Sequence, residues 1–132
     1  MRVHRRASKL LVTVALATAL GGTLAAPAAQ AAPAAPAAEC NVRPQDNRLW
    51  CGNQAPAPVR RLPYHDSPFI GQLQSTFSWF DCWRYGGQHG GGNATWYHTT
   101  PDWGENGWVP ADWVFTPSWF DANPSAYGLP KC

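Results

Sequence analysis

The sequence lacks the features that indicate a membrane-spanning or a helical protein. Its longest apolar run, residues 10–20, has 11 residues, whereas a transmembrane helix needs about 20. No window repeats apolar residues at positions i, i+3, i+4 and i+7, and Gly or Pro interrupts almost every segment. The sequence therefore predicts neither a transmembrane helix nor a bundle of helices.

The N-terminus has the pattern of a secretory signal peptide. Four basic residues precede the short apolar run: Arg2, Arg5, Arg6 and Lys9. Small residues at 29–31 (AQA) predict a signal peptide over residues 1–31, with cleavage before Ala32. Arg5 and Arg6 form a twin-arginine pair, but bulky apolar residues do not follow it, which favours the general secretion route. Cys40 lies far beyond the apolar run and follows Glu39, so no lipid anchor is expected after cleavage.

The basic charge of the chain belongs to this leader. Removing residues 1–31 takes away 4 of the 10 basic residues and none of the 8 acidic ones, which leaves a formal charge of −2. The remaining arginines are scattered, and a mildly acidic domain offers no electrostatic footprint for nucleic acid. We therefore expect a secreted, extracellular protein that does not bind nucleic acid.

The mature chain divides into a short spacer and one domain. Residues 32–39 are rich in Ala and Pro and predict an extended spacer, and residues 40–132 form the domain, with a core at about 57–115. All four cysteines lie in this domain: Cys40, Cys51, Cys82 and Cys132. In an oxidising compartment they indicate two disulfides. Of the three possible pairings we favour Cys40–Cys51 and Cys82–Cys132.

Short aromatic and β-branched runs between turn residues predict an all-β fold. The expected strands are residues 57–64, 70–73, 76–85, 94–100 and 107–110, with a continuation at 114–115. Residues 86–93 (GGQHGGGN) form a hairpin loop, 101–106 form a turn, and 111–113 form one tight helical turn. Five to six short strands in about 60 residues remove their edges most economically by closing into a small barrel. The N- and C-terminal extensions are expected to be irregular and stapled by the disulfides.

Four segments resemble a bacterial SH3-like (SH3b) domain. They are IGQL at 70–73, CW at 82–83, TWY at 95–97 and GWVPADWV at 107–114. The chain resembles in particular the small, secreted, disulfide-containing proteins of this type in high-GC Gram-positive bacteria. The resemblance covers roughly residues 59–115 and implies an SH3-like barrel that binds cell-wall peptide or another extracellular ligand. YHDSP at 64–68 departs from the Arg-x-Gly-Pro-like turn of many such domains.

The eight tryptophans divide into candidates for the core and candidates for a binding site. Trp83, Trp96 and Trp108 lie in the middle of expected strands, where large rings would fill a small barrel. Tyr64, Trp103 and Trp113 lie at or beside turns, where burial alone does not require them.

We therefore predict that these three rings form a ligand-binding groove. Asp66 and Asp112 lie beside them in sequence, and each carboxylate can accept hydrogen bonds from a peptide ligand. A wall peptide or glycan would then contact the rings and be oriented by the carboxylates.

Catalytic chemistry has weak support in the sequence. His65, His89 and His98 are the candidates for acid–base chemistry, but His89 and His98 show no zinc-ligand spacing and the cysteines are expected to be paired. We therefore expect these histidines to be ordinary turn or strand residues. Asp102 and Glu105 share one turn, where Asp102 is expected to cap the turn. We therefore expect a non-catalytic module with no cofactor or metal. The alternatives are a small secreted inhibitor or toxin-like protein that acts on a foreign protein, and, third, a small wall hydrolase.

Overall fold

The structure is a computed structural model that describes residues 21, 22, 26 and 39–132. Nearly all of the predicted signal peptide, its cleavage site and nearly all of the Ala/Pro spacer lie outside these described residues. Within the described residues, no helix has the length and apolar character needed to cross a membrane.

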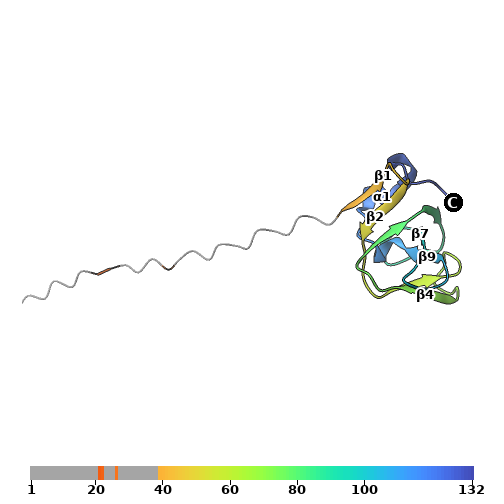
Figure 1. The fold of residues 1–132 in the computed structure, drawn as a ribbon, viewed down its shortest axis with the longest axis horizontal. Coiled ribbons are helices and arrows are strands. Elements are labelled where there is room, and N and C mark those ends of the chain that lie inside the picture. Colours follow the sequence, from red (N-terminus) through yellow and green to blue (C-terminus); the bar gives the residue numbers. More distant parts are fainter. Residues whose placement is uncertain (1–20, 23–25, 27–38) are drawn as a thin grey trace, which may run out of the picture. The chain divides into compact units, whose positions relative to one another are not determined.

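The domain is built almost entirely from short strands (Figure 1). They are β1 (Cys40–Arg43), β2 (Arg48–Gly52), β3 (Ala57–Arg60), β4 (Phe69–Leu73), β5 (Phe77–Phe80), β6 (Cys82–Tyr85), β7 (Thr95–Thr99), β8 (Trp103–Gly104) and β9 (Gly107–Pro110). Three short helical elements follow β9: η1 (Ala111–Trp113), α1 (Ser118–Ala122) and η2 (Pro124–Tyr127). The all-β fold and the tight helical turn at 111–113 are confirmed.

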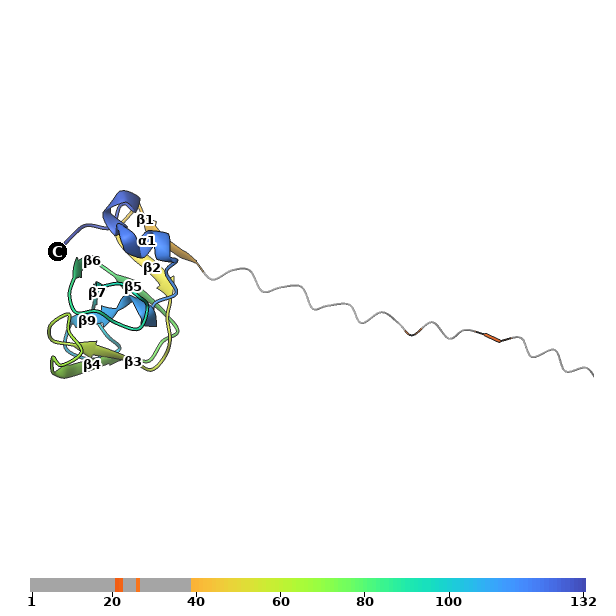
Figure 2. The same ribbon diagram turned by 180° about the vertical axis from the view of Figure 1, so that it is seen from behind.

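The strands form two antiparallel sheets. One has the order β1-β2-β5, and the other has the order β6-β7-β9-β3-β4-β8. In residues 39–132 neither sheet pairs its first strand with its last, so no sheet closes into a barrel. Figure 2 shows the β1-β2-β5 sheet beside the larger sheet.

The expected continuous strand at 76–85 is wrong, because the chain leaves one sheet and enters the other at Asp81. β5 pairs with β2, whereas β6 pairs with β7. Asp81 lies between them and donates its backbone N–H to the carbonyl of His98 at 3.0 Å. The segment carries aromatic residues on both faces because its two halves, β5 and β6, belong to different sheets.

The expectation of irregular terminal extensions is also wrong. Residues 40–52 form a β-hairpin, in which Asn47 takes a left-handed conformation (φ 53°) and donates its N–H to the carbonyl of Arg43. Asp46 accepts hydrogen bonds from the backbone N–H of Arg48 and from the indole N–H of Trp50. These local bonds fix the turn and thereby the register of β1 against β2.

The C-terminal tail contains helical turns that proline and glycine delimit. Pro117 precedes α1, Pro124 begins η2, and Gly128 ends it with a φ of 95°. Proline suits the first position of a helix and glycine the position after its last residue. The segment 101–106, which the sequence predicted to be a turn, also contains a short strand, β8, and this strand pairs with β4.

Trp83, Trp96 and Trp108 are buried, as expected, with 3%, 0% and 8% of their surfaces exposed. The core also contains Leu49, Ala57, Val59, Leu73, Phe80, Tyr97, Val109, Val114, Phe120 and Leu129. Members of this core come from both sheets and from α1, so the tail packs as part of the domain.

The cysteines pair as expected, Cys40 with Cys51 and Cys82 with Cys132. The first disulfide joins opposite residues of β1 and β2, and the second ties β6 to the last residue of the chain. Two disulfides are typical of proteins that fold in an oxidising compartment.

Candidate binding surface

The loop that carries Tyr64 and Asp66 is covered at its base by the glycine-rich loop. Tyr64 and Asp66 are exposed, and the N–H of Gly87 donates to the carbonyl of Pro63 at 2.8 Å. A Cβ atom on Gly86 would lie 2.0 Å from that same carbonyl oxygen, so this close approach requires glycine. The backbone of the two loops therefore lies in direct contact beside the Tyr64 ring.

Asp112 is half-buried on η1 and faces the other end of the glycine-rich loop, residues 86–93. A Cβ on Gly90 would lie 3.0 Å from Asp112 Oδ2. Asp112 Oδ1 is buried, has no hydrogen-bond partner among the residues that the structure describes, and lies 3.5 Å from Nδ1 of His89. Because residues 86–93 contact both Tyr64 and Asp112, the chain's own loop occupies the space between these two predicted site residues.

His89, expected to be an ordinary turn histidine, anchors this glycine-rich loop. Its ring is buried, with Nε2 2.9 Å from the carbonyl of Thr95, while Nδ1 accepts the N–H of Gly91 at 3.1 Å. A neutral ring with its proton on Nε2 satisfies both contacts. His89 therefore positions the loop and has no free ring nitrogen for acid–base chemistry in this arrangement.

Trp103 and Trp113 lie in separate surroundings. Trp113 is half-buried against the core. Trp103 lies on β8, is 58% exposed, and pairs with Phe69 of β4 at a ring-centroid distance of 6.2 Å. Within residues 39–132, no aromatic pair joins any two of Tyr64, Trp103 and Trp113.

Sequence reasoning missed a second aromatic surface, formed by the tail over β1. Trp119 and Tyr127 are 58% and 47% exposed, and their ring centroids are 4.8 Å apart. A pocket of about 250 Å³ opens beside them, lined by Cys40, Asn41, Val42, Trp119, Phe120 and Tyr127. We call this feature the tail pocket. The density of aromatic residues between Pro117 and Pro130 was the available signal, but turns of four or five residues show no helical period.

Not every surface tryptophan is free to meet a ligand. On the outer face of the small sheet, the guanidinium of Arg43 stacks on Trp50 at 4.0 Å, and that of Arg48 stacks on Trp79 at 3.9 Å. These arginines already cover one ring face of each tryptophan. The Phe69–Trp103 pair and the tail pocket are therefore the better candidates for ligand contact.

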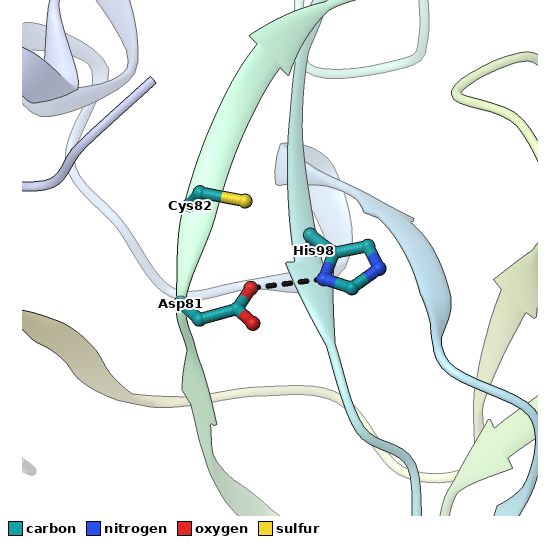
Figure 3. Close-up of side chains that lie close together, drawn as sticks. All are labelled: Asp81, Cys82 and His98. Carbon is teal, nitrogen blue, oxygen red and sulfur yellow. Dashed lines mark hydrogen bonds and ion pairs between the residues drawn. The ribbon is translucent and has the colours of Figure 1, made fainter. Parts of the chain in front are cut away.

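A third group, Asp81, Cys82 and His98, brings donor atoms within 4.8 Å of one another (Figure 3). Nδ1 of His98 lies 2.9 Å from Oδ1 of Asp81, and the two residues come from the β5–β6 junction and from β7. These are donor types that zinc accepts, but zinc binds the thiolate form of cysteine. Because the sulfur of Cys82 is bonded to Cys132, this cluster lacks a thiolate ligand while the disulfide is closed.

Comparison of the chain with protein-family models, curated proteins and solved structures finds no match in any of the three. The resemblance to SH3-like domains therefore stays a prediction, and the functional argument rests on the surfaces described above.

Proposed function

We propose that this protein is an exported, non-catalytic binding module of the SH3-like type that holds a cell-wall peptide or glycan on exposed aromatic rings. The SH3-like class is supported by two antiparallel sheets of short strands and by the strand, tight helical turn and bridge over residues 107–114. The signal-peptide pattern and the two disulfides support export.

The pairing of exposed aromatic rings carries the binding part of the proposal. Phe69 with Trp103, and Trp119 with Tyr127, expose about half of each side chain although a folded domain gains nothing by leaving such rings in water. Contiguous exposed apolar surface of this kind marks interaction sites. Neighbouring rings suit an extended ligand, because they offer apolar contact at successive positions along it.

Polar groups beside the rings supply the hydrogen bonds that orient a ligand. The exposed side chain of Asn41 lines the tail pocket, and Glu105 lies two residues from Trp103. Tyr64 and Asp66 are exposed on a third surface, so the predicted site residues offer a further contact region for the same extended ligand.

The test is sedimentation of the mature protein with purified peptidoglycan. We expect the parent to pellet, and we expect Trp103→Ala and Trp119→Ala each to weaken pelleting several-fold. Phe115→Ala is the matched control, because Phe115 is 59% exposed and forms no ring pair within the described domain. A Tyr64→Ala/Trp113→Ala double variant tests the predicted groove separately.

Equal pelleting of parent, Trp103→Ala and Trp119→Ala would place the binding site elsewhere on the molecule. If the parent does not pellet with walls of several stem-peptide types, wall binding is rejected. In that case the inhibitor-like alternative becomes the leading hypothesis.

A further inference from the structure

The two disulfides differ in how easily another thiol can reach them. In Cys40–Cys51, Cys51 is fully buried within the small sheet and Cys40 is half-buried at the edge of the tail pocket, so neither sulfur belongs to an exposed residue. In Cys82–Cys132, Cys132 is exposed, whereas Cys82 is half-buried. Access to the attacked sulfur is one determinant of the rate of thiol–disulfide exchange, so Cys132 is the favoured point of attack.

Titratable side chains also lie next to Cys82–Cys132. Cys82 lies beside the contact between Asp81 and His98 (Figure 3), and an imidazole stabilises a neighbouring thiolate when it is protonated. The carboxylate of Asp81, 2.9 Å from Nδ1 of His98, belongs to the same cluster and repels a thiolate.

His98 is the cation candidate that lies next to Cys82. Nζ of Lys131 lies 5.4 Å from the ring centroids of Trp83 and Tyr85, which point to the opposite face of β6 from Cys82. The guanidinium of Arg84 lies 5.7 Å from Trp108, the ring on which His98 packs. A ring nitrogen of His98 lies within 4.8 Å of the Cys82 sulfur, so stabilisation of a thiolate at Cys82 depends on His98.

We propose that Cys82–Cys132 is a site of reversible thiol–disulfide exchange with a low-molecular-weight thiol. The external thiolate attacks Sγ of Cys132, a new disulfide forms between these two sulfurs, and the Cys132–Cys82 bond breaks. The electron pair of the broken bond goes to Cys82, which leaves as a thiolate beside His98. No further oxidant or reductant is needed, because one disulfide replaces another.

The backbone explains why the step is reversible. Trp83 donates its N–H to the carbonyl of Pro130, and Cys132 donates its N–H to the carbonyl of Trp83, at 3.1 and 3.0 Å. These bonds keep the tail alongside β6 after the disulfide opens. The Cys82 thiolate therefore stays near the mixed disulfide on Cys132 and can attack it to restore the original bond.

Glutathione is the probe for the first experiment. The mature protein is incubated with glutathione at pH 7, quenched with acid, and digested for mass spectrometry. We expect glutathione on Cys132 with Cys82 free, and opening at least about ten-fold faster than that of Cys40–Cys51 in the same molecule. Equal rates for the two disulfides, or glutathione mainly on Cys82, would overturn the proposal.

The role of His98 is tested with His98→Gln at pH 6. We expect exchange about three-fold slower or more, because the leaving thiolate loses its stabilising cation. His65→Gln is the matched control, since His65 is exposed and packs on Trp96 instead. An unchanged rate in a folded His98→Gln variant would remove His98 from the mechanism.

A second measurement decides the question if His98→Gln does not fold. In Cys132→Ser the thiol of Cys82 is free and can be alkylated with iodoacetamide at pH 6. We expect it to react faster than the thiol of glutathione under the same conditions. Alkylation no faster than that of glutathione would show that the surroundings of Cys82 do not favour its thiolate, and the proposal would fall.

Discussion

At the scale of single residues, the Tyr97–Asp121 pair connects the larger sheet to helix α1. Asp121 is 6% exposed, and its Oδ1 accepts the hydroxyl of Tyr97 at 2.5 Å. Tyr97→Phe removes this hydrogen bond from the buried carboxylate, which is expected to lower the free energy of unfolding by about 1–3 kcal/mol. Urea denaturation at pH 7 measures the change. Tyr85→Phe is the control, because that hydroxyl is solvent-exposed and its loss should cost less than about 0.5 kcal/mol.

Asp121 also gives the domain a defined pH dependence. Burial raises the pKa of the Asp121 carboxyl above its ordinary value. The folded state then binds this proton more tightly than the unfolded state, so this group's contribution to stability falls as pH rises through the raised pKa. We expect Asp121→Asn to remove that contribution: between pH 4 and pH 7, the variant should lose less stability, or gain more, than the parent. Parallel stability curves for parent and variant would contradict this.

The tryptophans provide the sharpest contrast between core and surface. Trp108 is 8% exposed within β9, whereas Trp103 is 58% exposed on β8. Trp108→Ala removes a core ring and is expected to cost about 3–5 kcal/mol, a large share of the stability of a small domain. Trp103→Ala should leave the melting temperature near that of the parent. Both variants melting like the parent would contradict the assignment of Trp108 to the core.

Strand positions were enough to predict which tryptophans are buried, but not which surface rings meet. Trp83, Trp96 and Trp108 lie inside short aromatic and β-branched runs that the sequence assigns to strands, and this position in a strand predicted their burial. Trp103 meets Phe69 only because β8 pairs with β4, and this pairing joins residues far apart in sequence. A groove of Tyr64, Trp103 and Trp113 was inferred from their shared position at turns, which does not determine spatial proximity.

At the scale of elements, the turn between β4 and β5 is held by a residue from a different segment. Asp102 accepts hydrogen bonds from the N–H groups of Gln74 and Ser75 and from the Ser75 hydroxyl, at 2.7, 3.0 and 3.0 Å. The backbone bond from Ser75 is the main cause that lowers the pKa of Asp102. The sequence predicted that Asp102 caps its own turn at 101–106, whereas its carboxylate caps the turn at Gln74 and Ser75.

We expect Asp102→Ala to lower the free energy of unfolding by about 1 kcal/mol at pH 7, because two backbone donors then turn to water. The loss should shrink as pH falls, since a lowered pKa contributes stability only while the carboxylate is ionised. Chemical denaturation at pH 7 and pH 3 measures both values. Glu105→Ala, in the same segment with a loose 3.7 Å contact to Arg61, should change stability little. Equal effects of the two substitutions would contradict a specific role for Asp102.

Element boundaries followed from the sequence where turn residues mark them. The glycine-rich loop and the strands on either side of it are of this kind. The break at Asp81 was not predictable, because Thr76 to Tyr85 contains neither Gly nor Pro and only the change of partner strand divides it. The β1–β2 hairpin was missed for a related reason: Pro44 and several polar residues interrupt its apolar pattern.

At the scale of the whole molecule, the two disulfides close loops of very different length. Cys40–Cys51 closes a sequence separation of 11 within one hairpin, and Cys82–Cys132 closes a separation of 50 that includes the glycine-rich loop, β7, β9 and the tail. The longer loop loses more entropy when closed, so the second bond constrains the unfolded chain more strongly. The cysteine pairing and the all-β class were both predictable, whereas the division into two sheets depends on long-range pairing.

The last prediction follows from this difference. Replacing Cys40 and Cys51 by alanine is expected to cost about 3 kcal/mol, and replacing Cys82 and Cys132 about 4 kcal/mol. A domain of this size has a total stability of about 5–15 kcal/mol, so the variant lacking all four cysteines should lie near or below the limit of folding. Thermal unfolding followed by near-UV circular dichroism checks this, because the buried tryptophans report on packing. We expect cooperative but lowered transitions in both double variants, lower for Cys82/Cys132, and little or no cooperative transition in the quadruple variant. A quadruple variant that melts cooperatively near the parent temperature would show that the core alone specifies the fold.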